Sequence, residues 1–214
     1  MDAAYLGMWM MAFQNVVVGD PLVTITWGKQ TLTENKIWMG TNLVTGKINI
    51  PPGKTLTISS NAVINLKHNG ALEVEENGTL VIQPGAKLNF YNGSSLIVNG
   101  TLNAQGLSNN HIIFDRSGST NWYGIVINSS SGSSSNITNA EIKNANYGLL
   151  INNASPSITN TKINYCGTGI YILSGAAPKF YNNTITYNDY NGVTCIAGVT
   201  ASFGTFPTGR QRHS

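Results

Sequence analysis

The side chains in this sequence that could exchange protons with a ligand gather around His111. Lys87, His111, Glu141 and Lys162 follow one another at intervals that suit neighbouring turns of a repeat, with Asp115 close by. An imidazole beside a carboxylate can act as an acid/base pair, so His111, Glu141 and Asp115 are the candidate catalytic residues. The alternative, which we favour, is a ladder of exposed charges that compensate one another.

The other ionisable residues give little support for catalysis. Cleavage of sugars needs two carboxylates across a groove or a carboxylate cluster that binds calcium. The four aspartates are scattered along the chain, and Glu73, Glu75 and Glu76 suggest a solvated acidic turn. No Cys-x-x-Cys and no histidine pair occurs, so we expect no metal and no cofactor. Catalysis therefore remains an open question, and a non-enzymatic role is favoured.

A hydrophobic repeat must position these residues. Apolar residues return every 24 residues in six columns, two residues apart in pairs, as alternating strands require. The columns are Ile48, Leu72, Leu96; Ile50, Val74, Val98; Leu56, Leu80, Leu102; Ile58, Ile82, Ala104; Ile64, Leu88, Ile112; and Leu66, Phe90, Phe114. Three strands per period indicate one coil of a three-sided parallel β-helix. The Asn-Gly pairs would also suit hairpins of a β-sandwich, but hairpins do not predict this constant return.

After an interruption between Leu102 and Ile125 the repeat resumes at a shorter period. Strands open at Gly124, Gly148, Gly169 and Gly192. Asn139, Asn160 and Asn182 share one register, where stacked amides can hydrogen-bond along a solenoid and where Asn tolerates the left-handed conformation of a tight corner.

Ile-Ile-Phe (112–114), Trp122-Tyr123-Gly124-Ile125-Val126-Ile127 and the following Gly-Ile-x-Ile repeats carry a resemblance to known proteins. The chain resembles right-handed parallel β-helix proteins of the pectate-lyase-like class. More narrowly, it is similar to Asn/Gly-rich β-helix segments of large bacterial secreted and surface proteins, over about residues 48–197. The resemblance implies an all-β, right-handed, three-sided solenoid of about six to seven coils, and a secreted or cell-surface localisation.

The two ends lack the repeat. We expect an apolar N-terminal segment at 1–21 with a short helix, an N-terminal cap at 22–46, the β-helix at 47–200 and a loose or truncated tail at 201–214. The stretch Val16-Val17-Val18-Gly19-Asp20-Pro21 resembles the end of a gingipain-like peptidase domain, without that family's catalytic residues. It suggests that the chain is part of a longer protein.

One outward column becomes apolar over four coils. Ile97, Val126, Leu150 and Tyr171 lie between the paired inward residues of the first face. An apolar strip of this kind is usually covered by something. The candidates are residues 5–18, the loop 129–135, or a partner domain, which we favour; β-branched residues that simply suit strands are the alternative.

Composition limits the function classes. Charged residues make up only 10% of the 214 residues, and the net charge of +3 shows no basic run, so nucleic-acid binding and a membrane span are not expected. Cys195 falls on an inward column and Cys166 at a corner, which disfavours a disulfide. We expect a non-catalytic extracellular scaffold, adhesive or spacer module that contacts adjoining domains. The alternative is a β-helix that binds or cleaves a polysaccharide, with exposed tyrosines as candidate contacts.

Overall fold

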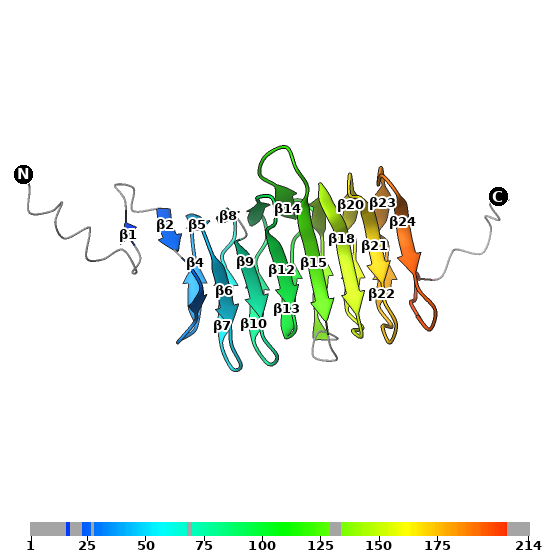
Figure 1. Ribbon diagram of the computed structural model, residues 1–214, viewed down its shortest axis with the longest axis horizontal. Coiled ribbons are helices and arrows are strands. Elements are labelled where there is room, and N and C mark those ends of the chain that lie inside the picture. Colours follow the sequence, from blue (N-terminus) through cyan, green and yellow to red (C-terminus); the bar gives the residue numbers. More distant parts are fainter. Residues whose placement is uncertain (1–15, 18–22, 27, 68–69, 129–133, 205–214) are drawn as a thin grey trace, which may run out of the picture.

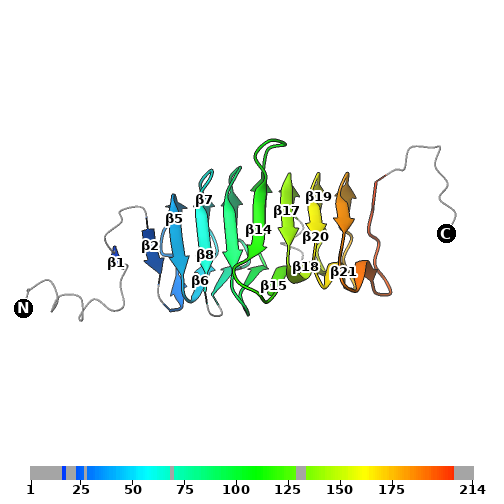
Figure 2. The same ribbon diagram turned by 90° about the horizontal axis from the view of Figure 1, so that it is seen from above.

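The chain winds about seven times around one axis, and each turn adds one strand to each of three sheets. The computed structural model describes residues 16–17, 23–26, 28–67, 70–128 and 134–204. Figure 1 shows the turns side by side along the long axis, from β2 to β24, and Figure 2 shows the same succession from above. Among the described strands, all pairs are parallel except β1 with β2, so the predicted parallel solenoid is confirmed and the β-sandwich is excluded.

Each sheet is built from every third strand of the chain. The nine-stranded sheet contains β1 (Val16–Val17), β2 (Val23–Thr26), β5 (Thr41–Val44), β8 (Val63–Leu66), β11 (Lys87–Phe90), β14 (Ile112–Arg116), β17 (Ala140–Lys143), β20 (Lys162–Asn164) and β23 (Thr184–Thr186). The seven-stranded sheet contains β4 (Lys36–Trp38), β7 (Thr55–Ile58), β10 (Thr79–Ile82), β13 (Thr101–Gln105), β16 (Asn136–Thr138), β19 (Ser157–Thr159) and β22 (Lys179–Tyr181). The eight-stranded sheet contains β3 (Gln30–Thr31), β6 (Lys47–Ile50), β9 (Ala71–Val74), β12 (Ser95–Val98), β15 (Trp122–Asn128), β18 (Ala145–Asn152), β21 (Thr168–Ile172) and β24 (Asn191–Cys195).

The core consists of the predicted apolar columns. Leu72 pairs with Ile48 on one side and with Leu96 on the other, and all three are essentially inaccessible to solvent. Alternation places their sequence neighbours outward, so each four-residue strand contributes two side chains to the core. Burial of each such side chain contributes about 1.5–3 kcal/mol, which offsets the entropy of ordering the strands.

The predicted register is wrong at one place, on the nine-stranded sheet. Leu88 pairs with Phe114, 26 residues later, and not with Ile112. Ile112 instead pairs with Ala140 and occupies an inward corner position, fully buried. The physical reason is the length of the corner before β14: eight residues separate Ala104 from Ile113, whereas four separate the positions paired with them one coil earlier, Ile82 and Lys87.

The shift leaves Arg116 opposite Phe90, where an apolar partner would be expected. The guanidinium instead donates to the Ser119 carbonyl and to the Asn121 amide oxygen. Trp122 fills the core in its place: its ring stacks on Phe90 with 4.0 Å between centroids, and its Nε1 donates to the Lys143 carbonyl. Trp122 therefore supplies the core with the apolar side chain that Arg116 does not provide.

The asparagine corner is confirmed. Asn139, Asn160 and Asn182 have φ values of 49°, 49° and 52°. The Asn182 amide donates to Oδ1 of Asn160 over 2.6 Å. Asparagine is one of the few residues with a side chain that adopts this left-handed conformation readily.

The N-terminal region joins the sheets of the solenoid directly. The expected N-terminal helix lies outside the described residues, except for Val16 and Val17, which form β1. The segment 22–46, expected as a cap, contributes β2 to β5 to the three sheets. The resemblance of residues 18–21 to a peptidase segment also lies outside the described residues.

At the C-terminal end one sheet is extended beyond β22. The Phe180 amide donates to the Ser202 carbonyl, and Phe203 stacks on Phe180 with 5.0 Å between ring centroids. Both cysteines are free, as expected. Cys195 has the predicted inward register opposite Ile172 but is exposed, because β24 is the last strand of its sheet in the described part of the chain.

Candidate functional site

A pocket of about 460 Å³ opens on the nine-stranded sheet beside the corner that precedes β14. Val63 and Ile113 provide its apolar lining, and Lys87, His111 and Glu141 provide ionisable groups. Asn61, Gly85 and residues 108–110 complete the lining with amide and hydroxyl groups. A pocket of this composition suits a small ligand with both apolar and polar faces.

The longer corner before β14 creates one wall of this pocket. The loop is closed by reciprocal backbone hydrogen bonds between Leu107 and Asn110, and the Asn110 side chain donates to Oδ1 of Asn61 two coils away. Gly85 lies between these two asparagines, and a Cβ at this position would come within 2.4 Å of both side chains. Only glycine leaves room for the amide bridge, and its φ of 77° also favours glycine.

The predicted charge ladder needs one correction. Ile113, not His111, stands between Lys87 and Glu141 in the outward column, as a direct result of the register shift. His111 precedes β14 and is exposed at the corner. His111 and Glu141 therefore share the lining of the pocket but are not strand neighbours.

Glu141 is held by two lysines. Its Oε2 lies 3.4 Å from Nζ of Lys143, and its Oε1 lies 3.4 Å from Nζ of Lys162. Lys143 also lies 3.7 Å from Oδ2 of Asp115. Neither oxygen of Glu141 can take a proton from a ligand without weakening an ion pair.

Asp115 is similarly engaged. Its Oδ1 accepts hydrogen bonds of 2.7 Å from the Asn144 side chain and from the backbone amide of Arg116. Asp115, Glu141 and His111 thus lie on one side of the solenoid, but the two carboxylates face the same lysine and not a shared open space. In the described ranges no group of three or more His, Cys, Asp or Glu residues is placed to hold a metal ion.

The outward apolar stripe lies on the eight-stranded sheet. Strand pairing aligns Ile97, Val126, Leu150 and Tyr171 over four coils, as expected. Val126 is 9% exposed, and the other three are half-buried.

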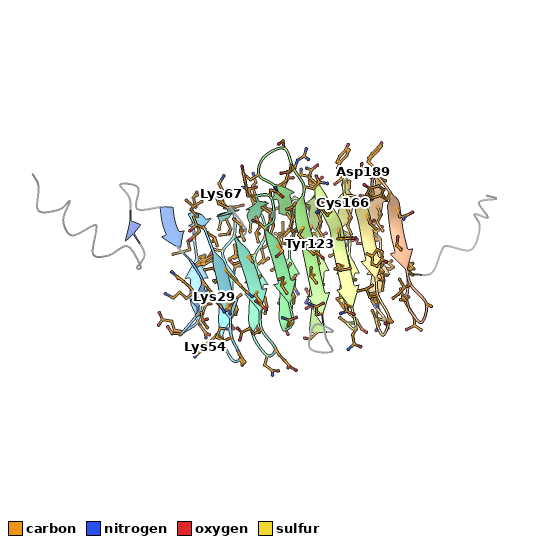
Figure 3. The ribbon with its side chains drawn as sticks, viewed as in Figure 1. Lys29, Lys54, Lys67, Tyr123, Cys166 and Asp189 are labelled. Carbon is orange, nitrogen blue, oxygen red and sulfur yellow. The ribbon has the colours of Figure 1, made fainter. Side chains whose placement is uncertain are left out.

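Two further tyrosines accompany the stripe. Tyr147 contacts the rings of Tyr123 and Tyr171 edge to face, with centroids 6.0 and 5.7 Å apart. Figure 3 shows Tyr123 on β15, midway along the solenoid. No sequence pattern placed Tyr123 beside the stripe, because it precedes the repeating strand positions.

The two proposed covers from this chain lie largely outside the described residues. Of residues 5–18, Val16 and Val17 pair with β2 in a different sheet from the stripe. Of the loop 129–135, Ser134 and Ser135 hydrogen-bond to Thr101 and Leu102 on the seven-stranded sheet. A partner for the stripe therefore stays a prediction.

A second corner carries tyrosines in place of asparagine. Asn144, Tyr165 and Tyr187 occupy equivalent positions between the nine-stranded and eight-stranded sheets, with φ values of 56°, 54° and 54°. The successive spacings of 21 and 22 residues, from Asn144 to Tyr165 and from Tyr165 to Tyr187, could have shown this register. Tyrosine, however, is not a residue from which the left-handed conformation is predicted.

Comparison with known proteins identifies the fold family. A family model described as a right-handed beta helix region matches residues 94–203, about half of the chain. Neither curated proteins nor solved structures gave a match. In the part of the chain that the structure describes, no helix is long and apolar enough to cross a membrane.

Proposed function

Because the chain belongs to the right-handed β-helix family, we propose that it is a non-catalytic scaffold, adhesive or spacer module. Its setting in this proposal is a larger bacterial protein that is secreted or held at the cell surface. The family alone fixes no activity, since a solenoid surface can carry many unrelated sites. The proposal therefore depends on the chemistry of the candidate site.

The observation that carries the proposal is the engagement of both carboxylates near the pocket. Glu141 lies between Lys143 and Lys162, and Asp115 is bound by Asn144 and by a backbone amide. A glycosidase needs one carboxyl group that protonates the leaving group and a second that attacks or activates water from across the substrate. Asp115 and Glu141 lie on the same sheet and pair with the same lysine, so they do not provide two carboxyl groups on opposite sides of a substrate.

The apolar stripe fits the same role. Ile97, Val126, Leu150 and Tyr171 would contact an adjoining domain of the parent protein, and half-buried apolar residues in a continuous row suit such a contact. The low charge of the chain and its small polar residues agree with an extracellular setting.

The test is a turnover assay of the purified protein on neutral and acidic polysaccharides, read by new reducing ends and by the ultraviolet absorbance of unsaturated products. We expect no turnover with or without calcium. Turnover that disappears in Glu141→Gln or in His111→Ala, while Lys179→Ala remains active, would refute the proposal.

A second candidate function is binding of a carbohydrate in the pocket. The pocket favours it because an apolar lining from Val63 and Ile113 adjoins amide, lysine and imidazole groups. Binding that is weakened by Lys87→Ala and His111→Ala, without turnover, would support this function in addition to the scaffold.

A further inference from the structure

Lys87 borders the pocket with a charge that pairs with no carboxylate of the described residues. Its neighbours in the outward column are Val63 on one side and Ile113 on the other. In the part of the chain that the structure describes, no carboxylate oxygen lies within 4.0 Å of Nζ, and the side chain makes no hydrogen bond. An exposed cation between two apolar side chains therefore faces the pocket.

The other charges beside the pocket balance one another. Lys143 and Lys162 each lie 3.4 Å from an oxygen of Glu141, and Lys143 also lies 3.7 Å from Asp115. These two ammonium groups match two carboxylates, so the charge of Lys87 stays uncompensated. An uncompensated charge at a hollow surface attracts ligands of the opposite sign, so the pocket favours an anion with a single charge.

The pocket also offers apolar surface on both sides of this charge. Val63 and Ile113 are half-buried, and their strands lie about 4.8 Å to either side of the strand that carries Lys87. Ile113 occupies this position because of the register shift, which leaves His111 at the corner. A ligand with its charged group at Lys87 therefore has hydrocarbon surface available for an apolar body.

The remaining lining supplies hydrogen-bond donors. The Asn110 side chain uses Nδ2 to reach Oδ1 of Asn61, and Nδ2 of Asn61 makes no hydrogen bond with another described residue. The imidazole of His111 likewise forms no hydrogen bond or ion pair within the described ranges. A carboxylate has two oxygens that each accept more than one hydrogen bond, so it suits a lining with a cation and several donors.

We propose that this pocket binds a small monocarboxylate with an apolar body, such as an arylalkanoate or a branched-chain acid. Lys87 forms a charge-assisted hydrogen bond with the carboxylate, and Val63 and Ile113 contact the hydrocarbon. The volume of about 460 Å³ lies within the range of pockets that hold small organic ligands. This inference adds a ligand to the proposed scaffold and is an alternative to a carbohydrate in the same pocket.

Two other anion classes fit less well. Inorganic phosphate carries up to two charges and no hydrocarbon, so it leaves one charge unpaired and the apolar walls uncovered. A uronic acid carries one charge, but the hydroxyl groups around its ring meet Val63 and Ile113, where they find no hydrogen-bond partner. Both serve as comparison ligands in the experiment.

The experiment uses the full chain with phenylacetate, 4-phenylbutyrate and 3-methylbutanoate, each beside its neutral amide of nearly the same shape. Binding is measured by calorimetry and by backbone amide shifts in NMR spectra. We expect saturable binding of at least one acid, and its amide should bind about fivefold or more weakly, because hydrogen bonds to charged groups are the stronger ones. The shift changes should gather at residues 85–87 and 108–113.

Two variants with matched controls test the charge and the apolar wall. Lys87→Gln should weaken binding of the acid about fivefold or more and affect its amide less, whereas Lys179→Gln, at an exposed lysine of the seven-stranded sheet, should bind normally. Ile113→Thr should weaken the acid and the amide alike by about fourfold. Val81→Thr, at an outward position of β10, should leave binding unchanged.

Four results would overturn the inference: no saturable binding by any of the three acids, equal binding of acid and amide, unchanged binding in Lys87→Gln, or shift changes confined to another face of the solenoid. Tighter binding of phosphate, galacturonate or cellohexaose than of every acid would also overturn it. Failure of the inference would leave the non-catalytic role in place, because that role is tested by turnover.

Discussion

Replacement of Trp122 by alanine should be the most damaging single change near the candidate site. Trp122 is completely buried, stacks on Phe90 and donates to the Lys143 carbonyl. Truncation of a buried tryptophan to alanine costs about 3–5 kcal/mol, and loss of the hydrogen bond adds about 1 kcal/mol. A total of about 4–6 kcal/mol is a large part of the 5–15 kcal/mol that stabilises a typical domain.

The measurement is urea unfolding followed by far-ultraviolet circular dichroism, which does not depend on tryptophan emission. With a slope of about 3 kcal/mol per molar urea, the midpoint should fall by about 1.3–2 M. Trp122→Phe is the control, because it retains an aromatic ring against Phe90 and loses the hydrogen bond, so it should cost about half as much or less. A Trp122→Ala variant that loses under 1.5 kcal/mol would refute the argument that this ring completes the core after the register shift.

Two other predictions concern particular residues. Burial raises the pKa of the Cys166 thiol to about 11 from 9.0, so the thiol ionises in the unfolded chain first as pH rises above 9. The free energy of unfolding should therefore fall between pH 9 and 11 by about 2–3 kcal/mol more than in Cys166→Ala. Urea titrations in which the two proteins lose the same free energy of unfolding over this pH range would contradict this. Gly85→Ala should cost more than Gly53→Ala by about 1 kcal/mol or more, because both glycines have positive φ but only Gly85 has side chains within 4 Å of an added Cβ; equal unfolding midpoints would show that the Asn61–Asn110 bridge gives way freely.

The repeat was sufficient to predict the solenoid because its inward columns are spaced by strand geometry. Leu72, pairing with Ile48 and Leu96, needs no information beyond the 24-residue return. The register after the insertion could not be predicted in the same way. Ile112 and Phe114 are two residues apart and both apolar, so either alignment satisfies the alternation, and only the length of the corner loop decides between them.

The candidate site was predicted less well for the same reason. A shift of β14 by two residues keeps its outward side chains outward, so the alternation alone does not reveal it. The shift places Ile113 instead of His111 in the ladder and leaves the predicted Glu141–Lys162 pair unchanged. The left-handed conformation of Tyr165 and Tyr187 could not be predicted for a different reason. The local preference of tyrosine disfavours this conformation, whereas hydrogen bonds between coils, such as the one from the Tyr165 amide to the Tyr187 carbonyl, impose it.

The parallel pairing of every coil with the next also determines how the molecule would respond to tension. The strands lie across the long axis (Figure 1), so the hydrogen bonds between them run along it. A force applied between the two ends therefore stretches these bonds along their length and separates one coil at a time. Strand pairing joins each coil only to the coils on either side of it, so detachment of an end coil leaves the rest folded. A coil of 24 residues would release about 80 Å of extended chain. A spacer built in this way would lengthen stepwise under load, and coils that remain attached would provide the template on which the released chain rewinds.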